Sequence, residues 1–201
     1  MLYPHKHIQM AEVRVNEEQI ISDKHFVLKN INFDILKKDG KWQTQNREVF
    51  DHGNAVAVLL YNREKRTVIL TKQFRIATYV NGNATGMLTE ACAGLLEGDE
   101  DPEDAVIREI KEETGYHITH VEKVYEAYSS AGSLTELLYL YIAEYGSGQQ
   151  KGEGGGLAEE GEEINVLEMS FDEATDMMEK GEIRDAKTII LLQYLKLKKV
   201  L

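Results

Sequence analysis

Alternating apolar and polar positions mark the first quarter of the chain as strand-forming. Residues 31–35 read Ile-Asn-Phe-Asp-Ile, an alternation with period two that predicts a half-buried strand. Residues 26–28 predict another short strand, and the turn residues Lys38-Asp39-Gly40 lead into a third one near Trp42. We therefore expect a small β-sheet region that extends to about residue 50.

From Ala55 onward the apolar positions become continuous. Residues 55–61 and 67–70 are apolar runs on either side of a polar turn, which predicts two buried strands in a core sheet. We expect further strands near residues 121–128 and 134–144, and a short one at 164–167. These strands would form the main sheet of the fold.

Helix signals separate these strands. Asp101 followed by Pro102 predicts a helix start, and Gly115 predicts the end of that helix. The sequence Ser-Phe-Asp-Glu at 170–173 is a capping box for a second helix that ends near Gly181, and a last helix is expected over residues 185–197. The stretch from 146 to 163 is rich in Gly and Glu, which predicts a flexible loop.

Acidic residues are concentrated in two places. Residues 97–113 hold nine acidic and two basic side chains, and residues 153–163 hold five acidic ones and no basic one. Together these segments carry as much charge as the whole chain, whose net charge is −12. Such local negative charge attracts cations and argues against nucleic acid as a partner.

Composition limits the class of protein further. The 201 residues suffice for one domain with a small appendage, and no apolar run approaches the roughly 20 residues that span a bilayer. The N-terminus shows no secretory signal pattern, and the single cysteine, Cys92, excludes an internal disulfide. We expect a cytoplasmic protein without a membrane partner.

Three carboxylates on the predicted first helix point to a metal. Glu109, Glu112 and Glu113 stand three and four positions apart, so they project from one helix face. Like charges at this spacing repel, and a hard cation such as Mg²⁺, or Mn²⁺ as a substitute, would offset the repulsion. By spacing alone, a Glu-rich face that is merely solvated stays the commoner alternative.

The surrounding residues resemble the Nudix box, the signature of enzymes that hydrolyse nucleoside diphosphates linked to another group. The order and separations match at Gly94, Glu100, Arg108, Glu109, Ile110, Glu112, Glu113 and Gly115. One position departs, because Tyr116 stands where the family usually has an aliphatic residue. The resemblance implies Glu109 and Glu113 as inner metal ligands, Glu112 as a further catalytic carboxylate beside them, and Glu100 with Arg108 as a structural brace.

Two flanking segments resemble the branch of this family that acts on ADP-ribose and sugar nucleotides. The lead-in Glu90-Ala91-Cys92-Ala93-Gly94 implies that the backbone carbonyl of Ala93 is a metal ligand. The acidic loop over 154–164 is similar to the catalytic loop of that branch. The likeness implies that Glu162 completes the metal shell and that Glu160 orients or deprotonates the attacking water. Taken alone, such a loop would be read as a solvated linker.

Further segments narrow the resemblance to the bacterial GDP-mannose pyrophosphatase subgroup. They lie at 47–49, 73–75, 79–83, 133–137 and 181–188, and the likeness extends roughly from Ile20 to Leu195. It implies substrate contacts at His25, Arg47, Glu48, Arg75, Glu136 and Lys187. Arg75 and Lys187 could neutralise phosphate oxygens, although an ordinary surface charge stays open for Lys187.

The resemblance implies a Nudix α/β/α sandwich with a mixed sheet over residues 53–201. It is preceded by an N-terminal β region over residues 1–52 that contributes dimer and substrate contacts. The implied function is Mg²⁺-dependent hydrolysis of a nucleotide sugar, GDP-mannose to GMP and mannose 1-phosphate, by a homodimer. Three alternatives stay open: an ADP-ribose pyrophosphatase, a catalytically silent nucleotide-sugar-binding module, and an acidic cation-binding domain without turnover.

Overall fold

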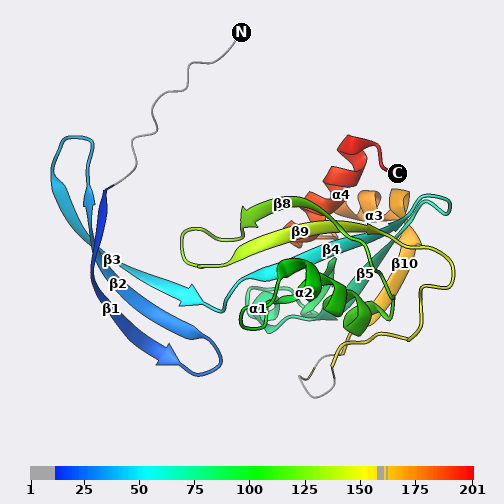
Figure 1. Cartoon of the computed structure of the whole chain (residues 1–201), viewed down its shortest axis with the longest axis horizontal. Helices are drawn as coiled ribbons and strands as arrows, with labels where there is room; N and C mark the ends of the chain where they lie inside the picture. Colours follow the sequence, from blue (N-terminus) through cyan, green and yellow to red (C-terminus); the bar gives the residue numbers. More distant parts are fainter. Residues whose placement is uncertain (1–11, 158–160, 162) are drawn as a thin grey trace, which may run out of the picture. The chain divides into compact units, whose positions relative to one another are not determined.

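Two compact units make up the fold. One holds the chain up to His52 together with Ser130–Glu136, and the other holds Gly53–Ser129 and Leu137–Leu201. The computed structural model describes residues 12–157, 161 and 163–201 (Figure 1). Ser130–Glu136 joins the first unit because the backbone of Phe50 bonds to both Ser133 and Thr135.

The first unit is built on a three-stranded antiparallel sheet. Its strands are β1 (Val13–Asp23), β2 (Val27–Leu36) and β3 (Trp42–Asp51), in that spatial order. The small N-terminal sheet is confirmed, but β1 was not predicted and β2 merges two segments expected as separate short strands. Register shifts between Val15 and Glu17 and between Ile20 and Ser22 interrupt the alternation in β1, which hides the strand from a period-two search.

The second unit contains a mixed seven-stranded sheet. Five strands follow the spatial order β10-β5-β4-β9-β8: β4 (Ala55–Asn62), β5 (Thr67–Phe74), β8 (Glu122–Tyr128), β9 (Leu137–Glu144) and β10 (Asn165–Ser170). β4 and β9 are parallel, whereas the other pairs are antiparallel. Two short strands that the sequence did not predict complete the sheet: β6 (Met87–Glu90) pairs with β5, and β7 (Cys92–Leu95) pairs with β4.

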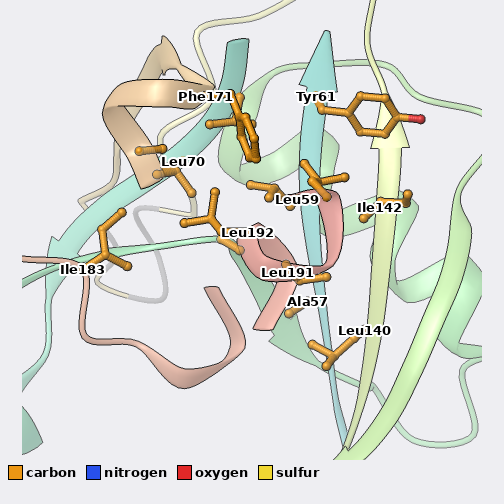
Figure 2. Close-up of a cluster of buried hydrophobic side chains, with 14 of the residues drawn as sticks. Ala57, Leu59, Tyr61, Leu70, Leu140, Ile142, Phe171, Ile183, Leu191 and Leu192 are labelled. Atoms are coloured by element: carbon orange, nitrogen blue, oxygen red, sulfur yellow. The ribbon is translucent and has the colours of Figure 1, made fainter. Parts of the chain in front are cut away.

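Helices cover both faces of this sheet, as β4 shows. Ala57 and Leu59 face a core cluster shared with α3 (Phe171–Glu179) and α4 (Ala186–Lys198) (Figure 2). Val56 and Val58 face a second cluster, which is shared with α2 (Pro102–Glu109) and the segment η1 (Ile110–Thr114) that continues it. Because alternate residues of a strand point to opposite faces, a fully apolar strand requires a layer on each side. The predicted α/β/α sandwich with a mixed sheet is confirmed.

The helix that carries the carboxylates differs from a regular α-helix in its last turn. It begins as predicted, because the Asp101 side chain accepts the N–H of Glu103 at 2.8 Å. It ends as predicted at Gly115, whose φ of 73° is left-handed. Between these points, η1 is a π-helical turn, a rare geometry that is frequent at functional sites.

The remaining helices are short. The five-residue α1 (Ile76–Val80) was not predicted, and α4 is the longest regular helix of the described chain, at 13 residues. None of the helices in the described chain is long and apolar enough to cross a membrane.

We expect Leu191→Ala to lower the free energy of unfolding by about 2–5 kcal/mol, because it removes a fully buried side chain from the cluster between β4 and α4. Leu197→Ala on the same helix is the matched control, since Leu197 is 78% exposed and its loss should change stability by no more than about 0.5 kcal/mol. Urea unfolding followed by circular dichroism measures both. Equal effects of the two substitutions would contradict the assignment of the core.

Candidate active site

Glu113 lies where the π-helical turn meets strand β7. Its carboxylate is buried, with the residue 2% exposed, and its Oε2 atom accepts the N–H of Ala93 at 3.2 Å. The N–H and C=O groups of one strand residue point to the same side. The Ala93 carbonyl is therefore directed towards the same region as the Glu113 carboxylate.

Glu109 lies against the next residue of the strand, Gly94. A Cβ atom at Gly94 would stand 1.8 Å from Glu109 Oε1 and 2.0 Å from its Cδ, so a side chain fits there only if the Glu109 carboxylate moves. The glycine is needed for this close approach of the carboxylate to the backbone. Glu109 and Glu113 thus both face β7 from the helix.

Arg108 holds the carboxylates of this region together. Its Nη2 donates to Glu100 Oε2 at 3.1 Å and to the Leu95 carbonyl at 3.2 Å. Its Nη1 donates to Glu109 at 2.8 Å and to Glu112 at 3.1 Å. The hydrogen bonds from Arg108 hold the pKa of Glu100 below its usual value, and the bond to Glu100 raises the pKa of Arg108 against the opposing effect of burial.

These groups fit a hard divalent cation. The oxygens of Glu109, Glu113 and the Ala93 carbonyl are the donor type that Mg²⁺ and Mn²⁺ prefer. Within the described residues, no group of three His, Cys, Asp or Glu side chains is arranged to hold a metal ion. Two carboxylates and one backbone carbonyl make an incomplete shell, which leaves positions for water, substrate or a further carboxylate.

The glycine-rich loop after β9 is fixed to the same helix end. Gly155 N–H donates to the Glu113 carbonyl at 2.9 Å, and Gly156 N–H donates to the Glu112 carbonyl at 3.2 Å. Gly154 has a φ of 69° and lies so close that a Cβ would stand 2.3 Å from the Glu113 carbonyl oxygen. The loop therefore starts at the carboxylate-bearing turn. Glu160 and Glu162, which were predicted on it, lie outside the described residues.

Glu90 brings Arg75 and Lys187 together. No role was predicted from the sequence for Glu90 itself. Arg75 Nε donates to Glu90 Oε2 at 2.7 Å, and Lys187 Nζ donates to Glu90 Oε1 at 2.6 Å. Lys187 also bonds to Asp185 at 2.8 Å. Burial acts to lower the pKa of Lys187, but the charges of Glu90 and Asp185 outweigh it and raise that pKa.

The other predicted substrate residues belong to the first unit. His25 lies in the turn between β1 and β2, while Arg47 and Glu48 are exposed on β3. Glu136 is largely buried, with a 14% exposed side chain, and its Oε2 lies 3.7 Å from His52 Nε2. His52 was not predicted as part of a site.

The chain belongs to the Nudix family, whose domain matches residues 51–192. The structure explains the match, since β7 carries Gly94 of the box, and α2 and η1 carry Arg108, Glu109, Glu112 and Glu113. Nudix hydrolases generally use a divalent metal, which agrees with the oxygen donors at this site. Residues 12–50 match a second family, described as the GDP-mannose pyrophosphatase NudK N-terminal domain.

Curated relatives cover nearly the whole chain. A GDP-mannose pyrophosphatase of Cronobacter sakazakii is 53% identical over 189 residues, 94% of this chain and 97% of the relative. A GDP-mannose pyrophosphatase of Escherichia coli is 48% identical over 186 residues, 92% of this chain and 96% of the relative. The family and these relatives together indicate a pyrophosphohydrolase.

We expect Gly94→Ala to lower kcat by about 100-fold, because the new methyl group displaces the Glu109 carboxylate by an ångström or more. Gly146→Ala is the matched control, since its Cβ would meet only Gln149 Oε1, at an ordinary 3.7 Å. Steady-state kinetics of pyrophosphate hydrolysis at saturating Mg²⁺ give kcat for both variants, and circular dichroism checks that both are folded. Near-normal turnover by a folded Gly94→Ala variant would show that the approach of Glu109 to β7 is unnecessary.

Proposed function

We propose that this chain hydrolyses the pyrophosphate bond of a nucleoside diphosphate sugar, converting GDP-mannose to GMP and mannose 1-phosphate with Mg²⁺. The observation that supports the proposal is that the carboxylates of Glu109 and Glu113 both lie against the backbone of β7, at Gly94 and Ala93. The substrate is proposed from the relatives, which are GDP-mannose pyrophosphatases. Mn²⁺ can take the place of Mg²⁺, because both prefer oxygen donors.

The metal would be held by the carboxylates of Glu109 and Glu113 and by the carbonyl of Ala93, with Glu162 as a further ligand. When bound, the cation supplies positive charge to the phosphoryl oxygens and acidifies water, an effect worth several kcal/mol of barrier. Glu112 adds a carboxylate beside these ligands, and its hydrogen bond to Arg108 fixes its orientation. Glu160 is our candidate for orienting or deprotonating the attacking water.

Arg75 and Lys187 would bind the diphosphate. Arg75 is exposed enough to meet a ligand, with a 40% exposed side chain, and a guanidinium has five N–H donors in a planar fork. By their resemblance to the same subgroup, His25, Arg47, Glu48 and Glu136 of the first unit are our candidates for further substrate contacts. Glu100 and Arg108 would hold the loop before α2 to the helix, a structural role.

We also propose a homodimer in a cytoplasmic location. Val13, Val15 and Ile20 of β1 are 48–64% exposed, an apolar surface of the kind that marks an interface. Cys92, the single cysteine of the chain, is buried, and a chain that cannot form an internal disulfide suits a reducing compartment. Light scattering of the purified chain should give twice the 22.8 kDa mass of one copy, and a monomer at micromolar concentration would reject the dimer.

A substrate panel tests the proposed reaction. The purified chain is incubated with Mg²⁺ and GDP-mannose, ADP-ribose, NADH or ADP-glucose, and the products are separated by chromatography. We expect GMP and mannose 1-phosphate from GDP-mannose, and no product when EDTA removes the metal. Faster release of AMP from ADP-ribose would assign the chain to that activity. Absence of product from every compound would leave a binding module without turnover.

A further inference from the structure

We infer that Glu90 is a positioning residue that holds Arg75 and Lys187 in place for the phosphate oxygens of the substrate. The inference rests on the proposed function and assigns a role to a residue that is not among the candidate substrate or metal contacts. Glu90 ends strand β6, whereas Arg75 follows β5 and Lys187 lies in the first turn of α4. One carboxylate therefore ties together three elements of the second unit.

The geometry at Glu90 uses both of its oxygens. Oε2 accepts from Arg75 at 2.7 Å and Oε1 accepts from Lys187 at 2.6 Å, while the carboxylate is only 4% exposed. Hydrogen bonds between charged partners in a buried setting are the strong ones. Glu90 therefore fixes the spacing of the two cations, which are 112 residues apart in the chain.

Both cations keep donors that Glu90 does not use. A lysine ammonium has three donors, of which Lys187 gives one to Glu90 and one to Asp185. Arg75 gives its Nε to Glu90, and its Nη groups have no carboxylate partner among the residues that the structure describes. The remaining donors are available to the oxygens of a bound diphosphate.

The cation pair lies close to the candidate metal ligands along the backbone. Glu90 and Ala93 are three positions apart, at the end of β6 and in β7, so their Cα atoms lie no more than about 10 Å apart. Over this span, Ala91 N–H donates to Thr188 Oγ1 of α4 at 2.7 Å and Ala93 N–H donates to Glu113 at 3.2 Å. The same short segment thus bonds both to the start of α4 and to the carboxylate-bearing turn. It connects the cations proposed for the diphosphate with the candidate metal ligands.

A role of Glu90 through its charge alone and a positioning role predict opposite effects of Glu90→Gln on substrate binding. Glu90 and Asp185 balance the charges of Arg75 and Lys187, so the cluster is neutral overall. If Glu90 acted only through its charge, Glu90→Gln would leave a positive cluster and would strengthen the binding of an anionic substrate. If Glu90 positions the cations, the same substitution weakens binding because their geometry relaxes.

The test is the steady-state kinetics of Glu90→Gln with GDP-mannose at a temperature where circular dichroism shows the variant folded. We expect KM to rise about 10- to 100-fold with a smaller change in kcat, the pattern of lost uniform binding. We expect the double variant Glu90→Gln, Lys187→Met to lose less kcat/KM than the product of the two single losses, because the residues act together. A fall in KM, an unchanged kcat/KM or independent effects of the two substitutions would each overturn the positioning role.

Two further variants complete the design. Glu168→Gln is the matched control, because Glu168 also accepts from a lysine, Lys65 at 3.0 Å, and from the Tyr145 hydroxyl at 2.9 Å, but it forms no ion pair with Arg75 or Lys187 in the described chain. It should change the melting temperature but not kcat/KM. If Glu90→Gln does not fold, Glu90→Asp replaces it: the charge is kept but the oxygens recede by one methylene, and a normal KM would then overturn the inference. Failure of the unmodified chain to hydrolyse GDP-mannose would instead reject the proposed function itself.

Discussion

The close contact between strand β7 and the helical segment α2–η1 is the constraint on which the site depends. At Gly94 the strand has no side chain, and the Glu109 carboxylate occupies the space that a Cβ would take. One residue earlier, the Ala93 N–H is bonded to the buried carboxylate of Glu113. A carboxylate is costly to bury without partners, so this contact also stabilises the helix in its position. The loop from β9 adds a second close contact, at Gly154, to the same helix end.

Electrostatics explain why so acidic a segment can remain folded. Arg108 provides positive charge to Glu100, Glu109 and Glu112 at once, and its side chain is only 25% exposed. Glu113 accepts the backbone N–H of Ala93. The carboxylates that face β7 are oxygen donors of the kind that a divalent cation prefers. At Glu90 the numbers are reversed, because one buried carboxylate accepts hydrogen bonds from two cations, Arg75 and Lys187.

The sequence predicts the local features of the site well. The start of the helix at Asp101, its end at Gly115 and the two buried strands β4 and β5 depend on neighbouring residues, and the structure has them where the pattern placed them. The π-helical turn was missed, because its apolar and polar spacing also suits an α-helix. β6 and β7 were missed because four residues are too few to show a period.

Contacts between residues far apart in the chain were not predicted, because no local sequence pattern indicates them. Glu90 and Lys187 are bonded across 97 residues, so the carboxylate partner of the predicted cation could not be read from the pattern. Ser130–Glu136 belongs with the first unit through backbone bonds to β3, which a linear division of the chain does not show. Gly94 is an intermediate case: the box spacing identified it, and the structure shows that the Glu109 carboxylate lies where its side chain would be.

Binding of Mn²⁺ to the unmodified chain and to Glu113→Gln, followed by the electron paramagnetic resonance of free Mn²⁺, tests the metal site most directly because it needs no substrate. Glu103→Gln on α2 is the control, since Glu103 is exposed and faces away from the core. We expect Glu113→Gln to bind Mn²⁺ at least about tenfold more weakly, because losing a ligand should cost no less than losing an outer-shell partner. Equal affinity in the folded Glu113→Gln variant and the unmodified chain would contradict a metal site at β7 and η1.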